Sequence, residues 1–187
     1  FKNINLYCKL KMGKLDVKPT SLKKVLMIVP PTIFEDYRGL YIETYNEKLY
    51  NQEGIDVKFV ADSFIISDKN VLRGIHGDSK TWKLVNCLHG RFYIVIINCD
   101  ESSAEFGKWA SFTLSETNRK QLLVPPKHGI AHLILSEKVI YHYKQSTFLE
   151  DKKEFTYRWD DPRFNIMWPI KDPILSEKDK KAELISK

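Results

Sequence analysis

Cysteine is scarce in this sequence, and no run of apolar residues is long enough to cross a membrane. The three cysteines, Cys8, Cys87 and Cys99, form no CxxC pair, and their odd number favours neither a disulfide framework nor a zinc site. Cys87 and Cys99 lie in apolar, strand-like segments and are expected to be small core residues. We therefore predict a protein with no membrane partner in a reducing, cytoplasmic setting.

The sequence also lacks features that would divide the chain into several domains or repeats. It has no internal repeat, no low-complexity segment and no stretch with the composition of a linker. Residues 1–14 are basic but lack the apolar core and cleavage site of a signal peptide. We expect residues 1–24 to form an N-terminal arm that is partly mobile or pairs with a neighbouring subunit, and residues 25–187 to form a single domain.

The chain carries an excess of positive charge, with 30 Lys and Arg residues against 24 Asp and Glu residues and a formal net charge of +6. Such an excess suits an anionic ligand such as a nucleotide diphosphate. Nucleic acid is a competing partner, but the basic residues are scattered and no RNP-type motif or Cys/His finger accompanies them. A generally lysine-rich composition explains the excess most simply, and we expect no nucleic-acid partner.

Short segments rich in β-branched and aromatic residues recur along the chain between turn-forming residues. The expected strands are 25–29, 40–45, 57–67, 83–88, 91–98, 109–114, 120–124, 131–135, 139–143 and 155–159, with a turn at 34–39. Helical signals are confined to 47–54 and to 176–185, where Ser176 is a good N-cap followed by Asp179. This pattern predicts an all-β sandwich or barrel with short peripheral helices, one of them C-terminal.

The stretch Val71 to Asp78 combines basic and titratable side chains. Arg73 and His76 are three residues apart, so the regular alternation of a strand would place them on opposite faces. A kink at Gly74 would bring both to one cavity, near Lys83. In the functional interpretation His76 is a general base, while Arg73 and Lys83 hold negative charge on a substrate. The alternative is a surface arginine, a structural histidine and a solvated lysine.

Sequence blocks along most of the chain resemble a known family. The blocks are Asp36-Tyr37-Arg38-Gly39 with Glu43; Leu72 to His76; Trp82-Lys83-Leu84-Val85; Ser103 to Trp109; Val124-Pro125-Pro126-Lys127 with Ala131-His132; Tyr143-Lys144; Trp159 to Pro162; Trp168-Pro169; and Leu175 to Asp179. In this order, from about residue 27 to 180, they resemble the dTDP-4-keto-6-deoxyglucose 3,5-epimerase family. The resemblance implies a cupin-type jelly roll, a homodimer, and catalysis without a metal or other cofactor.

Members of that family invert ring carbons beside the C4 ketone of a nucleotide-linked sugar, and the resemblance implies roles for individual residues here. His76 would remove the proton, Asp179 would pair with its imidazole, Tyr143 would be the acid on the opposite face, and Lys83 would stabilise the enolate. The substrate-binding residues that the resemblance implies are Arg38, Glu43, Arg73, His132 and Lys178.

Taken one by one, these residues have simpler interpretations. Tyr143 alone would be a core tyrosine, Asp179 a carboxylate in the first turn of a helix, and His132 a core histidine. No role is assigned to His89, His128 and His142.

Several positions depart from the family pattern although the proposed catalytic set is kept. Ala61 replaces a glutamine, Ser63 an asparagine and Phe148 a tyrosine, and all three are expected to border the substrate. The block after His76 is short and reads Gly77-Asp78-Ser79-Lys80-Thr81-Trp82, where a tyrosine and a glutamine are common.

The blocks RGIHGD, TWKLV and VPPKHGIAHL are similar to the branch that acts on GDP-4-keto-heptoses in Campylobacter-type capsule synthesis. We therefore predict inversion of C3, C5 or both in a GDP-4-keto-heptose, with a dTDP-4-keto-6-deoxyhexose as the alternative substrate.

Other functional classes fit these residues less well. A non-catalytic cupin that binds a sugar nucleotide would not need His76, Asp179 and Tyr143 together. A nucleic-acid-binding barrel would depend on salt-sensitive phosphate contacts. An isomerase of the same superfamily that moves the ketone would need two histidines flanking it, whereas the opposite group here is Tyr143.

Overall fold

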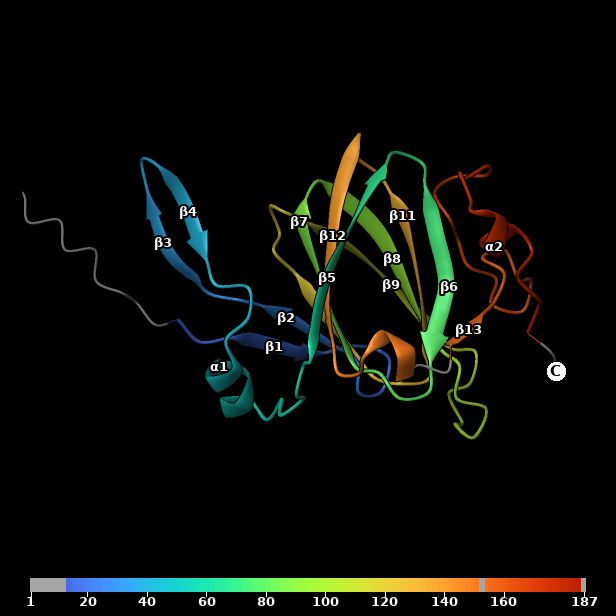
Figure 1. The fold of residues 1–187 in the computed structure, drawn as a ribbon, viewed down its shortest axis with the longest axis horizontal. Coiled ribbons are helices and arrows are strands. Elements are labelled where there is room, and N and C mark those ends of the chain that lie inside the picture. Colours follow the sequence, from blue (N-terminus) through green and yellow to red (C-terminus); the bar gives the residue numbers. More distant parts are fainter. Residues whose placement is uncertain (1–12, 152–153, 186–187) are drawn as a thin grey trace, which may run out of the picture.

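In the computed structural model, which describes residues 13–151 and 154–185, two antiparallel sheets pack face to face (Figure 1). The six-stranded sheet, in spatial order, contains β1 (Asp16–Pro19), β2 (Leu26–Val29), β10 (Gln121–Val124), β7 (Lys83–His89), β12 (Lys138–Gln145) and β5 (Ala61–Asp68). The five-stranded sheet contains β13 (Glu154–Thr156), β6 (Leu72–Asp78), β11 (His128–Ile134), β8 (Arg91–Asn98) and β9 (Trp109–Ser115). The predicted all-β class is confirmed.

Strand β8 shows why a strand of this fold is apolar at consecutive positions. Phe92, Ile94 and Ile96 belong to the core between the sheets, whereas Val95 and Ile97 belong to a second cluster that the segment after β13 completes. All of these side chains have 0% of their surface exposed. Because both faces of this strand are buried, its side chains are apolar on both faces, and the alternation of apolar and polar residues typical of a half-exposed strand is absent.

The outer face of the six-stranded sheet is covered at one end only. There α1 (Glu47–Gln52) and the loop after it bury Tyr50 against Leu84. Farther along the same face, Phe64 and Ile66 of β5 are 64% and 53% exposed. An apolar area is therefore left uncovered beside α1.

The hairpin of β3 (Thr32–Asp36) and β4 (Gly39–Ile42) projects away from the sandwich (Figure 1). The prediction of a turn across 34–39 is wrong for its first half, because strand pairing continues to Asp36 opposite Gly39. The turn signals mark only the tip, where the Arg38 N–H donates to Asp36 at 2.8 Å and Gly39 has a φ of 121°.

The C-terminal helix α2 (Glu177–Lys180) is shorter than predicted. Ser176 caps it as expected by accepting a hydrogen bond from the Asp179 N–H at 3.1 Å. Beyond the helix, the N–H of buried Ile185 donates to Asp161 Oδ2 at 2.8 Å, and this contact draws the chain out of the helical path. In the ranges 13–151 and 154–185, no helix is long and apolar enough to cross a membrane.

The structure describes only residues 13–24 of the expected N-terminal arm; residues 1–12 lie outside the described residues. Within that part, β1 pairs antiparallel with β2 of the same chain, with Asp16 opposite Val29 and Pro19 opposite Leu26.

An extra residue in β6 changes the direction of its side chains beside β11. Ile130 pairs with His76 and His132 pairs with Arg73, so β6 advances three residues while β11 advances two. The irregularity surrounds Gly74, which has a φ of 112°. A bulge of this kind interrupts strand alternation, and Arg73 and His76 line the same cavity as a result. The predicted kink at Gly74 is confirmed.

Replacing Gly74 tests how tightly this bulge is packed. A Cβ at Gly74 would lie 2.3 Å from the Ile130 carbonyl oxygen and 2.7 Å from Ala131 Cα. We expect Gly74→Ala to lower the free energy of unfolding by about 3 kcal/mol or more, because neither backbone atom can move aside easily. Urea unfolding measures the loss.

Gly107→Ala is the matched control. Gly107 also has a positive φ, 78°, but open space surrounds the position its Cβ would take. Only the conformational cost of about 1 kcal/mol is expected there. Equal losses in the two variants would contradict the packing argument.

Candidate active site

A cavity of about 230 Å³ opens between the two sheets, and side chains from both sheets line it. Its polar and titratable lining residues are Arg73, His76, Lys83, His132, Tyr141, Tyr143, Glu154 and Lys178. Ionisable side chains gathered in one concave site are a reason to examine the site for catalysis.

His76 enters the cavity from β6 and is held by α2. Its Nε2 lies 2.5 Å from Asp179 Oδ1, and Ser176 Oγ donates to Asp179 Oδ2 at 2.9 Å. The Asp179 side chain is 2% exposed, whereas that of His76 is 38% exposed. When Nε2–H donates to the carboxylate, the lone pair of the imidazole is on Nδ1, which is then the nitrogen able to accept a proton.

Hydrogen bonds determine the charge of Asp179. Burial acts to raise the pKa of this carboxyl, but the hydrogen bond and charge of His76, together with the Ser176 hydroxyl, hold the pKa below its ordinary value. The ionised carboxylate fixes the orientation of the imidazole and stabilises the imidazolium that forms on protonation. The pair is therefore suited to the work of a general base.

Tyr143 and Lys83 line the same cavity from the six-stranded sheet, opposite the sheet that carries His76. Tyr143 of β12 pairs with Val85 of β7, and Lys83 lies two positions before Val85 and so on the same face. An imidazole and a phenol on facing sheets can act on opposite sides of a ring held between them. An ammonium beside them can stabilise negative charge on that ring.

The cavity has an excess of positive charge. Arg73, Lys83 and Lys178 line it, and among the described lining residues the only carboxylate is Glu154, whose Oε2 lies 3.6 Å from Lys178 Nζ. Arg73 is oriented by the hydroxyl of buried Ser67, to which its Nε donates at 3.1 Å. This arrangement favours an anionic ligand.

His132 and Tyr141 stack beneath these groups, with ring centroids 4.1 Å apart and planes 13° from parallel. Burial lowers the pKa of His132 to about 3, and the charges of Arg73 and His76 act in the same direction. Burial likewise raises the pKa of Tyr141. Both rings are therefore neutral near pH 7. His132 forms part of the cavity wall and is not suited to act as a general base.

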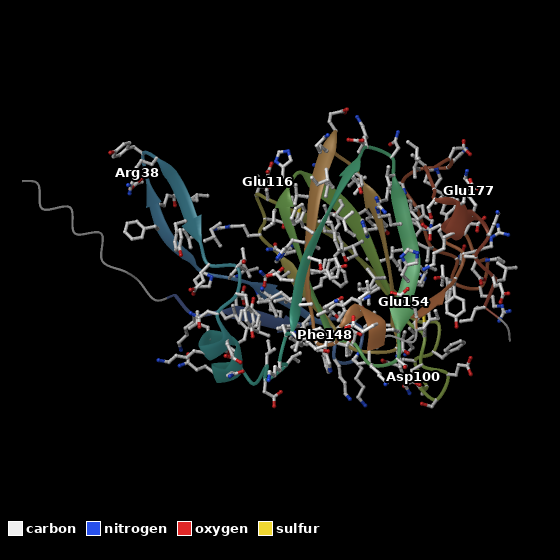
Figure 2. The ribbon with its side chains drawn as sticks, viewed as in Figure 1. Arg38, Asp100, Glu116, Phe148, Glu154 and Glu177 are labelled. Atoms are coloured by element: carbon white, nitrogen blue, oxygen red, sulfur yellow. The ribbon has the colours of Figure 1, made fainter. Side chains whose placement is uncertain are left out.

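Two predicted binding residues, Arg38 and Glu43, lie away from this cavity. Arg38 sits at the tip of the hairpin, paired with Asp36, and Figure 2 shows it far from Glu154 at the cavity. Glu43 accepts a hydrogen bond from Asn46 Nδ2 at 2.8 Å. Because the hairpin points away from the sandwich, neither side chain reaches the cavity of its own chain.

Ala61, Ser63 and Phe148, which depart from the family pattern, are not among the lining residues of the cavity but are near neighbours in sequence of residues that line it. Ala61 and Ser63 lie on the same face of β5 as Ile65, which lines it. Phe148 is 51% exposed and directly precedes Leu149, another lining residue. These positions can contact a ligand that extends beyond the cavity.

Sequence reasoning missed Tyr141, Glu154 and Asp78 as parts of the site. Tyr141 shares a face with Tyr143 two residues later, and Asp78 follows His76 by two residues, so strand alternation gave a usable signal for both. Glu154 has no local signal, because only the pairing of β13 with β6 brings it to the cavity.

The remaining histidines lie outside the cavity lining. His89 pairs with Glu116, His142 pairs with Asp62, and His128 Nδ1 lies 3.0 Å from the Pro126 carbonyl oxygen. In the described part of the chain, no group of three or more His, Cys, Asp or Glu side chains is arranged to hold a metal ion.

Comparison with known proteins places these observations in a family context. A family model described as dTDP-4-dehydrorhamnose 3,5-epimerase matches residues 19–187. The enzyme of that name from Shigella flexneri is 37% identical over 171 residues, which cover 88% of this chain and 93% of that protein.

Solved structures give the same result. The dTDP-4-dehydrorhamnose 3,5-epimerase of Elizabethkingia anophelis superimposes with a TM-score of 0.83 at 35% identity, covering 91% of this chain and 96% of its own. A dTDP-6-deoxy-D-glucose-3,5-epimerase from Legionella pneumophila, solved with dTDP-4-keto-L-rhamnose, gives a TM-score of 0.84 at 31% identity and covers 91% and 92%. The predicted cupin-type architecture is confirmed by these neighbours.

The neutral state of His132 has a measurable effect on acid stability. The unfolded chain takes up a proton on this histidine near its ordinary pKa of 6.5, but the folded protein does so only near 3. The unfolded state therefore binds more protons between these values, and stability falls as the pH drops through that window. We expect His132→Phe to remove up to about 1.4 kcal/mol of this loss per pH unit, measured by urea unfolding across the window.

Phe92→Leu provides the control, because Phe92 packs against His132 and carries no ionisable group. It is expected to lower stability equally at every pH and to leave the slope of stability against pH unchanged. If His132→Phe also left the slope unchanged, His132 would not be held neutral by the fold.

Proposed function

This chain belongs to the dTDP-4-dehydrorhamnose 3,5-epimerase family, and from that premise we propose that it inverts C3 and C5 of a dTDP-linked 4-keto-6-deoxyhexose. The chain is an isomerase, as predicted. The observation that carries the proposal is the cavity lined by His76 from one sheet and by Tyr143 and Lys83 from the other.

The proposed reaction begins with His76. A proton on a carbon next to a ketone is acidic enough to be removed when the resulting enolate is stabilised. His76 Nδ1 takes that proton, and the ionised Asp179 stabilises the imidazolium. The electron pair of the broken C–H bond moves to the C4 oxygen, where the Lys83 ammonium balances the charge.

Inversion requires that the proton return to the other side of the ring. Tyr143 stands on the opposite sheet and donates its phenolic proton to the carbon while the C4 carbonyl re-forms. His76 then releases its proton to solvent and Tyr143 regains one. Because C3 and C5 both adjoin C4, one pair of groups serves both centres once the sugar shifts within the cavity.

The nucleotide and sugar follow from the comparisons. The family model and the relatives described above are named for dTDP-linked deoxyhexoses, and none of them supports the predicted GDP-4-keto-heptose branch. The predicted alternative is therefore the better-supported substrate. Ala61, Ser63 and Phe148 are the positions through which a different nucleotide sugar would be selected, and this keeps the GDP-heptose as the second candidate.

Deuterium exchange tests both the reaction and the substrate. The enzyme is incubated in D₂O with dTDP-4-keto-6-deoxyglucose and, in a separate reaction, with a GDP-4-keto-heptose. We expect deuterium to enter C3 and C5 of the dTDP-linked sugar, and NMR or mass spectrometry measures its incorporation. Exchange only with the heptose would reverse the substrate assignment, and exchange at one carbon would make the enzyme a single-centre epimerase.

Variants of the base and the acid separate catalysis from binding. His76→Asn is expected to slow exchange by at least about a hundredfold, because the amide of asparagine cannot take the proton that the imidazole accepts. Tyr143→Phe is expected to permit some exchange while slowing formation of the inverted product. A non-catalytic binding protein would show no exchange with the wild type, and full exchange by His76→Asn would eliminate the proposed base.

We also propose that the enzyme is a homodimer in which the hairpin of each chain reaches the cavity of the other. The resemblance implies that Arg38 and Glu43 bind substrate, yet neither lines the cavity of its own chain, and Arg38 lies at the tip of the projecting hairpin (Figure 2). The hairpin exposes Leu40 and Tyr41 at 56% and 60%, and Phe64 on the uncovered sheet face is similarly exposed. A second chain docked on these apolar surfaces would bury them and complete the site.

Mixing two inactive variants tests this exchange. Arg38→Ala and His76→Asn are unfolded together and refolded, which forms mixed dimers. If the hairpin acts on the partner's cavity, each mixed dimer contains one intact site, and about one quarter of wild-type activity returns. No recovery beyond the sum of the separate variants would place Arg38 in the site of its own chain or outside any site.

A further inference from the structure

Asp78 occupies a fixed position beside the cavity without lining it. It is the last residue of β6, two residues after His76, and its side chain is 1% exposed. Its backbone pairs with Glu154 of β13, and its carbonyl accepts a hydrogen bond from the Lys127 N–H at 2.7 Å. The carboxylate therefore has little freedom to move.

The two oxygens of Asp78 have different contacts. Oδ1 accepts hydrogen bonds from the backbone N–H groups of Lys80 at 3.0 Å and Thr81 at 2.7 Å, which closes the turn after β6. Oδ2 lies 4.0 Å from Lys83 Nζ. Oδ1 thus fixes the turn after β6, and Oδ2 faces the Lys83 ammonium.

The carboxylate remains ionised despite its burial. Burial acts to raise the pKa of Asp78, but the Thr81 hydroxyl and the backbone N–H groups of Lys80 and Thr81 hold the pKa below its ordinary value. At 4.0 Å the buried carboxylate attracts the Lys83 ammonium, which is 17% exposed, and the burial of Asp78 makes this attraction less screened than it would be between two surface groups.

We propose that Asp78 is a positioning residue for the reaction: it holds the Lys83 ammonium in place and in its charged form, ready to receive the developing enolate oxygen. The inference rests on the proposed function for its catalytic part. Asp78 itself is not among the residues that line the cavity, whereas Lys83 is, so its proposed action on the substrate passes through Lys83.

The other charges in the cavity explain why a carboxylate is needed. Arg73 and Lys178 are cations in the same lining, and His76 becomes one after proton abstraction; each of them disfavours a charged Lys83. Glu154 opposes this effect but lies at Lys178, while His132, Tyr141 and Tyr143 are the remaining titratable groups of the described lining. The buried negative charge of Asp78, 4.0 Å from Lys83 Nζ, offsets this repulsion.

Titration of Lys83 tests the proposal without any substrate. Trace labelling with acetic anhydride over a range of pH, read by peptide mass spectrometry, gives the pH at which half of the Lys83 amine is reactive. Asp78→Asn keeps an oxygen for the turn and removes the charge. We expect the half-labelling pH of Lys83 to fall by about one unit in this variant. Asp78→Gln serves as the second neutral variant, and Asp78→Glu is expected to restore the wild-type value.

Two control variants separate charge from structure. Thr81→Val removes a hydroxyl that supports Asp78 but leaves the charge, so it is expected to lower thermal stability without shifting the labelling of Lys83. Asp100→Asn removes a turn-closing carboxylate outside the cavity, paired with Lys127 at 3.0 Å, and is expected to leave Lys83 unchanged.

Kinetics test the catalytic part. Asp78→Asn is expected to lower kcat at neutral pH by roughly tenfold with little change in KM, and to move the alkaline limb of the pH profile to lower pH. In a Lys83→Met background, Asp78→Asn is expected to cause no further loss in exchange rate, because its action passes through Lys83.

The outcomes that would overturn the proposal are distinct from failure of the proposed function. The proposal would be overturned if Asp78→Asn and Asp78→Gln both left the labelling of Lys83 unchanged. It would also be overturned if Asp78→Asn lowered the exchange rate by the same factor in the wild type and in the Lys83→Met variant. If the wild type exchanged deuterium into neither nucleotide sugar, the proposed function would fail, while the labelling experiment would still decide whether Asp78 holds Lys83.

Discussion

The site depends on one extra residue in β6. Because β6 advances three positions where β11 advances two, Arg73 and His76 line one cavity instead of facing opposite sides of the sheet. Gly74 makes this possible, since a side chain there would collide with the Ile130 carbonyl. A local departure from strand geometry, held by close backbone packing, thus places His76, the proposed base, in the cavity.

The two sheets then divide the chemistry between them. The five-stranded sheet carries His76 and receives its carboxylate partner from α2, while the six-stranded sheet carries Tyr143 and Lys83. In the proposed reaction, a sugar ring held between the sheets meets the proposed base, His76, on one side and the proposed acid, Tyr143, on the other. The sandwich is therefore more than a support, because the separation of its layers provides the two-sided access that inversion of a carbon requires.

Sequence patterns predicted most of this arrangement. Alternation and turn residues identified most of the strands, and the pairing of Ser176 with Asp179 identified the start of α2. Sequence patterns gave wrong or no predictions where contacts between distant residues determine the structure. The predicted C-terminal helix ends early because Asp161 accepts a hydrogen bond from the Ile185 N–H. Glu154 reaches the cavity only through the pairing of β13 with β6. The position of Arg38 away from the cavity could not be predicted from local sequence patterns, because the direction of a hairpin depends on the packing of the whole molecule.

The distance along the chain between His76 and Asp179 has a consequence for biosynthesis. The two residues are 103 positions apart, and the carboxylate belongs to a helix of 4 residues that cannot be stable alone. A ribosome finishes both sheets before it reaches this helix, so the nascent sandwich already has an imidazole but not its partner. In the proposed mechanism, competence for proton transfer therefore arises late in translation. Loss of the chain from residue 179 onward would remove the carboxylate together with Ile185, which is buried in the second core cluster.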